Sequence, residues 1–217
     1  MEESAQLEEK QRRALDRLKP VSDRLGLYLA GGRAIAFHLG HRVSPDLALF
    51  SRSPDLDLGA LRRAVVALPE VQVISLSDAM FRFRIDTVPV DVVRYGYPLL
   101  NATAEGPEGF STASLEDLAT MKLAAIARHG SQRDFWDLSE ILRRGSLSLE
   151  RALECYVRRF ASDESDVYHV LRALTYFEDA EREATQQPHG LTDETWATIK
   201  ADLTAHAKRV MLASLER

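Results

Sequence analysis

Two glycines and two aspartates are the residues of this sequence whose types and spacing could do chemistry. Gly31 and Gly32 follow an apolar run directly and precede a helical pattern, and Asp46 opens the next apolar run. Paired glycines let backbone N–H groups approach an anion closely, and the start of a helix adds partial positive charge. The glycine turn is therefore predicted to bind phosphate.

A second acid, Asp91, lies between valines in a short apolar strand pattern. Mg²⁺ in proteins prefers one or two carboxylates together with phosphate oxygens and water. In one interpretation Asp46 and Asp91 therefore hold a cation beside the glycine turn. In the other, the strand lies at the edge of a sheet and Asp91 simply faces water.

The elements that must position these residues differ between the two halves of the chain. In residues 1–110, short β-rich runs alternate with helical patterns, which predicts an α/β core that begins with an N-terminal helix. Strands are expected at 27–30, 46–50, 71–76, 81–85 and 88–94, and helices at 6–25, 34–39 and 57–68. The segment 99–112 is rich in turn residues and is predicted to be a linker.

Residues 111–217 show one helical pattern after another. Ser131 and Asp134 have the spacing of a capping box, and Gly130 and Gly145 stand where helices would end. Helices are expected at about 115–129, 132–144, 148–160, 165–184 and 193–215. The whole chain is therefore predicted to be an α+β protein, an α/β core followed by an all-helical C-terminal region.

Composition excludes several classes of protein. The 33 acidic and 28 basic side chains give a net charge of −5, which argues against avid nonspecific binding of nucleic acid. Cys155 is the single cysteine, so an internal disulfide and a cysteine-based zinc site are not expected. The charged start and the lack of a long apolar run predict a cytoplasmic protein with no membrane segment.

Four ordered blocks of the sequence resemble a known family. They are Leu29-Ala-Gly-Gly32, His38-Leu-Gly-His-Arg-x-Ser-x-Asp46, Met121-Lys-Leu-Ala-Ala-Ile-Ala-Arg128 and Gln132-Arg-Asp-Phe-Trp-Asp137. This wording is similar to the AbiEii/AbiGii-type toxins of the DNA polymerase β-like nucleotidyltransferase superfamily. The resemblance implies a nucleotidyltransferase-like core with a mixed sheet, and Mg²⁺-dependent transfer of a nucleotide from a nucleoside triphosphate to RNA, such as tRNA, or to protein. Some members of the family are toxins paired with a cognate antitoxin.

The resemblance also implies roles for individual residues. Gly31 and Gly32 match the phosphate turn, Asp46 and Asp91 match metal-binding acids, and Lys122 matches a lysine that would contact the triphosphate. Asp134 matches a further catalytic acid, with the nucleotide-binding candidate Arg133 beside it. Without the family, Arg133 and Asp137 could simply form an ion pair on a helix surface.

Two positions depart from the family pattern. Ala48 stands where the second acid of an Asp-x-Asp motif is expected, and Arg33 stands where a small hydroxyl residue usually follows the two glycines. Because phosphoryl transfer depends on positioning and electrostatics, we expect the missing carboxylate to impair transfer. Arg33 either binds a nucleotide phosphate or is solvated. The alternative function is a noncatalytic nucleotide-binding or partner-binding protein that keeps this fold.

Overall fold

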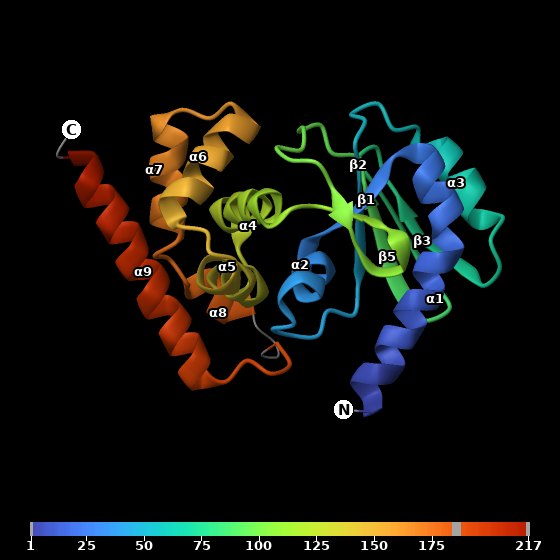
Figure 1. Cartoon of the computed structure of the whole chain (residues 1–217), viewed down its shortest axis with the longest axis horizontal. Coiled ribbons are helices and arrows are strands. Elements are labelled where there is room, and N and C mark those ends of the chain that lie inside the picture. The colour runs from blue at the N-terminus through green and yellow to red at the C-terminus, as the bar shows by residue number, and fades with distance from the viewer. Residues whose placement is uncertain (1, 184–187, 216–217) are drawn as a thin grey trace. The chain divides into compact units, whose positions relative to one another are not determined.

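The computed structural model of the chain describes residues 2–183 and 188–215. They form two compact units, divided between Ser114 and Leu115. Figure 1 shows that the first unit contains the sheet and the second is built from helices. The predicted fold class, α+β with an all-helical C-terminal region, is confirmed.

The first unit is organised by a mixed sheet of seven strands among the described residues. Their order across the sheet is β3-β4-β5-β2-β1-β7-β6. The bounds are β1 Leu27–Ala30, β2 Leu47–Ser51, β3 Val71–Leu76, β4 Met80–Ile85, β5 Val88–Val93, β6 Ala104–Glu105 and β7 Ser111–Thr112. β2 runs antiparallel to β1 and parallel to β5, so three strands that are distant in sequence lie next to each other at the centre.

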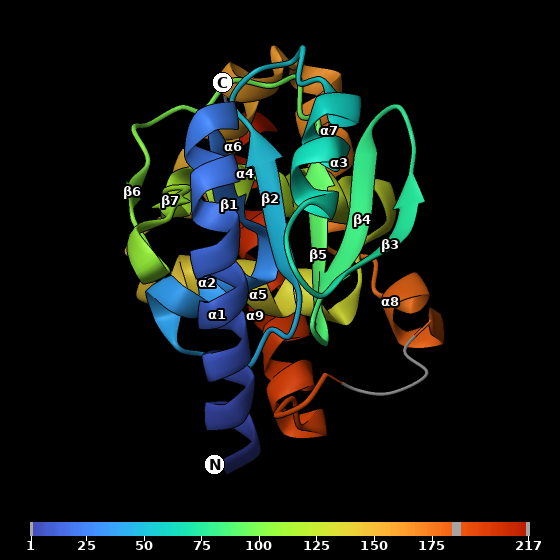
Figure 2. The same ribbon diagram turned by 90° about the vertical axis from the view of Figure 1, so that its right-hand side faces the viewer.

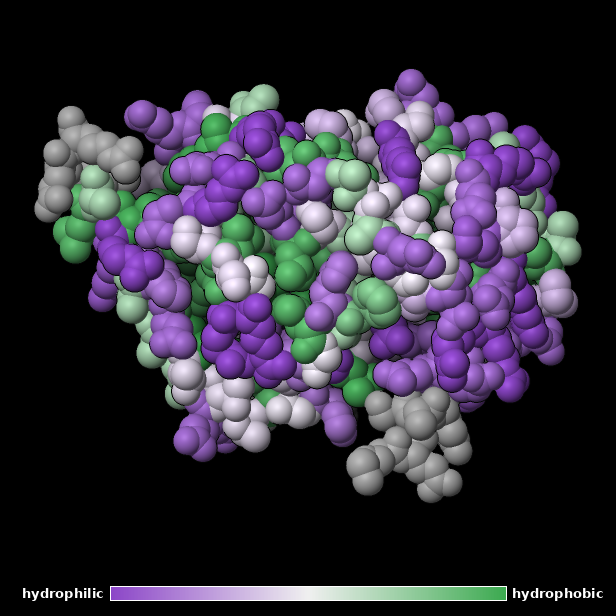
Figure 3. All heavy atoms as spheres, in the orientation of Figure 1, coloured by the Kyte–Doolittle hydropathy of each residue, from purple (hydrophilic) through white to green (hydrophobic). Residues whose placement is uncertain are grey.

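Helices cover both faces of this sheet. Figures 1 and 2 show α1 (Glu2–Leu25) and α3 (Leu58–Val66) on one face, and Figure 1 shows α2 (Gly31–Leu39) on the other. Side chains alternate between the faces of a strand. Accordingly Leu47 and Leu49 of β2 are buried, whereas Ala48 between them is partly exposed. In the space-filling view, hydrophilic side chains cover the outer surface of α1 (Figure 3).

The second unit packs its helices around aromatic side chains. Its elements are α4 Leu115–His129, α5 Gln132–Arg144, α6 Leu149–Phe160, α7 Glu164–Ala173, α8 Glu178–Glu183 and α9 Asp193–Leu215. The rings of Phe135, Phe177 and Trp196 lie 5.0 to 6.0 Å apart between centroids. Asp134 accepts a hydrogen bond from the backbone N–H of Ser131, which confirms the predicted capping box at the start of α5.

Two predictions about the elements are wrong. The helix expected at 165–184 is interrupted between α7 and α8. There the Thr175 hydroxyl donates to the carbonyl of Arg172, a local hydrogen bond that competes with the backbone bonds of a helix. Residue 184 lies outside the described residues. The segment 99–112 is not a free linker, because β7 pairs with the open edge of β1 and Phe110 is buried.

Among the described helices, none combines the length and apolar character needed to span a membrane.

The N-terminal helix fixes the loop that leads into β2. The side-chain amide of Gln11, which is buried in α1, donates to the carbonyl of Ser44 at 2.7 Å and to that of Pro45 at 2.9 Å. These bonds hold the chain directly before Asp46. The position of the predicted acid therefore depends on a tertiary contact with the first helix.

Replacing Gln11 tests this contact. Gln11→Leu keeps a side chain of similar size but leaves two carbonyl groups without their donor, and we expect a loss of about 1 to 3 kcal/mol of unfolding free energy. Urea denaturation followed by circular dichroism measures it. Gln72→Leu, at an exposed position of β3, is the control and should change stability by less than about 0.5 kcal/mol. Equal stability of both variants would show that the contact is not significant.

Candidate functional site

The first glycine of the turn is required by the backbone and by its neighbour. Gly31 has φ +65°, a left-handed conformation that other residues rarely adopt, and it begins α2 directly after β1. A Cβ atom added to Gly31 would lie 3.2 Å from the Cβ of Ala48. The start of α2 therefore lies directly against the middle of β2.

The second glycine provides space for the loop before β2. A Cβ atom on Gly32 would lie 2.5 Å from Nη2 of Arg42 and 3.0 Å from Oγ of Ser44. Arg42 and Ser44 were not among the predicted site residues, although both stand in the motif that ends at Asp46. Spacing alone could not identify them, because their contact with Gly32 depends on how the loop turns.

Strand register places Asp91 beside Ala48, two residues after the other predicted metal-binding acid, Asp46. Ala48 of β2 is the register partner of Asp91 of β5. Asp46 lies two residues before Ala48, which is the spacing of side chains on the same face of an extended chain. Because β5 lies between β4 and β2, the edge strand expected in the alternative interpretation is not found, although the Asp91 side chain is 38% exposed.

Asp46 and Asp91 interact electrostatically. Partial burial raises the pKa of Asp91, and the negative charge of Asp46 raises it further, whereas Arg82 opposes the shift. The Nε atom of Arg82 lies 3.5 Å from Oδ2 of Asp91. Two carboxylates that repel each other can share a cation, so this donor set fits one Mg²⁺ ion. Among the described residues, no group of three His, Cys, Asp or Glu side chains could hold a metal.

Arg33 is not a solvated side chain. It is 12% exposed, and its Nη1 atom lies 3.9 Å from a carboxylate oxygen of Glu8 in α1. Burial lowers the pKa of Arg33, and Glu8 partly offsets this effect. Within the described residues the Nε atom of Arg33 is buried without a hydrogen-bond partner. The interpretation of Arg33 as a solvated residue is therefore wrong.

In the second unit, Lys122 is bound by two aspartates. Its Nζ atom lies 2.7 Å from Oδ1 of Asp134 and 2.9 Å from Oδ2 of Asp137, which is fully buried. Burial alone would lower the pKa of Lys122, but the two carboxylates outweigh it and raise the pKa above its ordinary value. Burial would likewise raise the pKa of Asp134, but Lys122 and the hydrogen bonds from Ser131 lower it. The lysine is charged at neutral pH.

The interpretation of Arg133 and Asp137 as a surface ion pair is wrong. Arg133 is exposed, whereas Asp137 is buried and binds Lys122. Asp57, a further acid that follows β2 in the chain, has a structural role. Asp57 caps α3, where its carboxylate accepts from the N–H of Ala60 at 2.9 Å.

Comparison with known proteins decides the family. The family described as nucleotidyl transferase AbiEii toxin, type IV TA system, matches residues 13–214. The chain belongs to the AbiEii family. This confirms the resemblance drawn from the four sequence blocks. An uncharacterized protein of Aquifex aeolicus is 30% identical over 179 residues, which span 82% of this chain and 86% of that protein.

Solved structures share the AbiEii fold. MenT4, a nucleotidyltransferase toxin from Mycobacterium tuberculosis, has a TM-score of 0.64 at 17% identity, over 94% of this chain and 84% of MenT4. JHP933 from Helicobacter pylori has a TM-score of 0.58 at 17% identity, over 100% of this chain and 97% of JHP933. At these identities the comparison shows a common nucleotidyltransferase fold.

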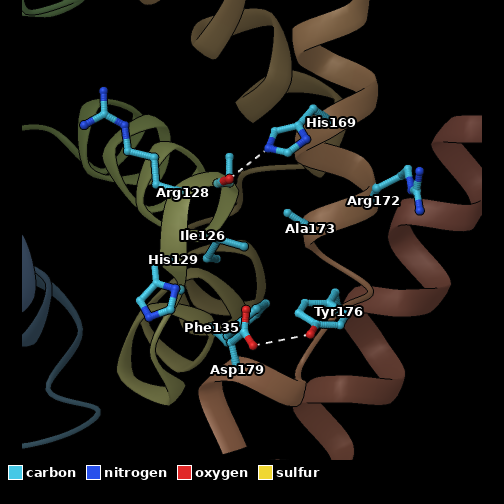
Figure 4. A pocket seen from close by; sticks show the side chains of 11 residues that line it. Ile126, Arg128, His129, Phe135, His169, Arg172, Ala173, Tyr176 and Asp179 are labelled. Atoms are coloured by element: carbon cyan, nitrogen blue, oxygen red, sulfur yellow. Dashed lines mark hydrogen bonds between the residues drawn. The ribbon is translucent and has the colours of Figure 1, made fainter. Parts of the chain in front are cut away.

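The helical unit of this AbiEii-family chain contains a cavity of about 430 Å³ between α4, α7 and α8. Figure 4 shows that Arg128 and Arg172, which line it, extend in opposite directions. The polar groups of His169 and Tyr176 already bond to the carbonyl of Ala127 and to Asp179. A binding site usually has convergent polar groups that are available to a ligand. This cavity lacks that arrangement.

The interaction between Asp46 and Asp91 can be measured directly. Because the charge of Asp46 raises the pKa of Asp91, Asp46→Asn should lower the pKa of Asp91. A pH titration of side-chain carboxyl carbons by NMR measures this shift. Asp55→Asn removes the same charge from a position beyond β2 and should leave Asp91 unchanged. If neither variant moves the titration of Asp91, the two acids do not face a common site.

The ion pairs of Lys122 with Asp134 and Asp137 predict that the pH dependence of stability is reversed in a Lys122→Met variant. The lowered pKa of Asp134 stabilises the wild-type unit above about pH 4, the ordinary value, and this contribution is lost as the pH falls further. In Lys122→Met the buried carboxylates lose their cation, so their pKa values should rise and stability should increase on acidification from pH 7 to 5. At pH 7 the expected loss is about 3 to 5 kcal/mol.

Urea denaturation of the variant at both pH values tests this reversal. Lys200→Met is the control, because the Lys200 side chain is 35% exposed and its partner Glu181 is 43% exposed. That change should cost less than about 1 kcal/mol. A Lys122→Met variant with the same stability at pH 5 and pH 7 would contradict the proposed electrostatic balance.

Proposed function

We propose that the chain binds a nucleoside triphosphate with Mg²⁺ at the Gly31-Gly32 turn, and that it is a nucleotidyltransferase whose transfer step is impaired. The observation that carries this proposal is the position of Ala48. Ala48 is the register partner of Asp91 and lies against Gly31, in the middle of the face that carries the acids. A methyl group stands there in place of a metal-binding carboxylate.

The glycine turn supports the binding of phosphate. Gly31 begins a nine-residue helix, and the first N–H groups of a helix have no partner within it. These groups and the helix dipole favour an anion. Arg33, in the same helical turn, adds a buried guanidinium. We assign Gly31, Gly32 and Arg33 to the phosphates.

Asp46 and Asp91 are assigned to the metal ion. Bound Mg²⁺ would neutralise phosphate charge and stabilise the charge that develops during transfer. The electrostatic effect of Asp46 on Asp91, which adds to the larger effect of burial, supports the assignment because it places the two carboxylates near each other. A two-acid site holds a nucleotide-bound ion but lacks the bridging ligand that fixes a second one. Binding should therefore be retained more fully than transfer.

Lys122 is assigned to the triphosphate and Arg133 to nucleotide binding. An ammonium group has three N–H donors. Asp134 and Asp137 accept from the ammonium of Lys122 and hold it in its charged form. We interpret Asp134 as a residue that orients Lys122 and keeps its ammonium group protonated. The exposed Arg133 offers a further cation.

The acceptor is assigned by class only. The family description names a toxin of a type IV toxin–antitoxin system, and MenT4 is a nucleotidyltransferase toxin. We propose an RNA or protein acceptor, with tRNA as an RNA candidate, and a cognate antitoxin as partner. The second candidate function, nucleotide binding without transfer, is favoured by the same Ala48. The two functions differ only in whether any transfer remains.

Restoring the carboxylate tests the proposal. Ala48→Asp should increase transfer of labelled nucleotide from Mg·NTP to RNA or protein by at least about tenfold, because a bridging ligand contributes several kcal/mol to such a transition state. The same variant should be less stable than wild type without Mg²⁺, since a third carboxylate joins Asp46 and Asp91. Added Mg²⁺ should recover that loss, which differential scanning calorimetry detects.

Ala48→Asn is the matched control, because it has the same shape and no charge. It should raise neither transfer nor the thermal response to Mg²⁺. If Ala48→Asp fails in both assays, the assignment of this face as the transfer site is wrong. If wild type binds Mg·NTP and Ala48→Asp responds to Mg²⁺ without transfer, the noncatalytic function is correct.

A further inference from the structure

The strand β3 is an open edge of the sheet. It is the outermost strand, next to β4, and Figure 2 shows it at the margin of the first unit. Three of its side chains are large, apolar and exposed: Val73 is 39%, Ile74 is 53% and Leu76 is 46% exposed. Large apolar side chains that gather on one exposed element commonly mark an interaction surface.

β3 lacks the side chains that usually keep an edge strand from pairing. Its sequence, Val71-Gln-Val-Ile-Ser-Leu76, contains no charged residue and no proline. Edge strands of natural proteins often carry such residues, because the open N–H and C=O groups of an edge can bind another strand. What β3 does have is a β-bulge, where the register with β4 shifts between Val73 and Ser75. A bulge bends and twists an edge strand, so its effect on pairing depends on where it places the side chains.

The bulge changes which residues of β3 share a face. Val71 and Leu76 both have buried residues of β4 as register partners, whereas Gln72 and Ser75 both have exposed arginines of that strand. In a regular strand, residues five positions apart lie on opposite faces. Because of the bulge, Val71 and Leu76 instead lie on one face of the sheet, and Gln72 and Ser75 lie on the other.

This arrangement makes β3 complementary to a copy of itself. In an antiparallel pair of two β3 strands about the strand midpoint, Val71 of each strand is opposite Leu76 of the other, and Gln72 is opposite Ser75. The members of each pair share a face and a character, since apolar meets apolar and polar meets polar. No charge of one strand is opposite a charge of the other. Such matched cross-strand pairs stabilise a sheet and specify its register.

We propose that β3 binds the β3 strand of a second copy of this chain, in an antiparallel pair about a twofold axis between Val73 and Ile74. The sheets of the two copies then form one continuous sheet, in which the open backbone groups of each edge bind those of the other. The pairing does not use the glycine turn or the acids, so it is independent of the proposed function. Because two six-residue strands form less than a standard interface, we expect a dissociation constant of about 10 to 100 µM.

Sedimentation velocity of the full chain, at concentrations up to about 300 µM, tests the dimer. Ile74→Lys brings two lysines close to the twofold axis and should weaken the dimer by about tenfold or more. Leu212→Lys is the matched control, because it places the same charge at an apolar position of α9 that is 63% exposed, and it should leave the dimer unchanged. Thermal unfolding of each variant confirms that it is folded.

Disulfide cross-linking tests the register. Gln72→Cys in one chain would be opposite Ser75→Cys in the other, so a mixture of these two variants should form a linked dimer when oxidised glutathione is added. Either variant alone should not form a link through β3, because its two cysteines would be three residues apart along the pair, about 10 Å. The native Cys155 is buried, and the wild-type chain is the control for its contribution.

The outcomes decide what occupies the edge. A wild-type dimer that Ile74→Lys weakens, together with a disulfide link only in the mixture, supports the proposal. A wild-type chain that stays monomeric at the highest concentration overturns it, and the edge is then open only to a strand of another protein. A dimer that Ile74→Lys does not weaken forms through another surface, which also overturns it. A link in Gln72→Cys or Ser75→Cys alone shows a different register, and the twofold axis between Val73 and Ile74 is then wrong.

Discussion

The pairing of three central strands determines which side chains lie beside the glycine turn. β1 ends at the glycine turn, β2 carries Ala48 and β5 carries Asp91, and their register places these positions side by side. Because side chains alternate along a strand, a shift of one residue would move Asp91 into the apolar face under α1 and α3. The buried leucines and valines on that face fix the register. The same hydrophobic packing that stabilises the unit thus fixes the position of the acid.

Much of the fold could be predicted from the sequence, because its elements are determined locally. The strands at 27–30 and 71–76 and the helices at 115–129 and 132–144 lie where the patterns place them. Turn residues, caps and apolar periodicity act within a few positions of each other. The pairing of β7 with β1 could not be predicted in this way, since Thr112 and Leu29 are far apart in sequence and the turn-rich composition of 99–112 hides the pairing.

The candidate site was predictable in its residue types but not in its contacts. The acids and the glycine turn follow from their spacing and from the family resemblance. The partners of Lys122 do not, because Asp134 and Asp137 reach it from another helix and one of them looked like a surface residue in sequence. Arg42 shows the same limit. A cation in a loop is ordinary in sequence, and its contact with Gly32 depends on how the loop turns.

An alanine at position 48 has an electrostatic consequence for the metal-free fold. In the absence of a metal, nearby carboxylates repel each other; the pKa of Asp91 is raised mainly by burial and to a smaller extent by the charge of Asp46. A third carboxylate at position 48 would increase that repulsion, so alanine there favours the metal-free fold. Catalytic sites commonly reduce stability in this way, and the loss of a catalytic group can stabilise the protein that carries it. Ala48 therefore avoids a third carboxylate charge beside Asp46 and Asp91 in the metal-free protein.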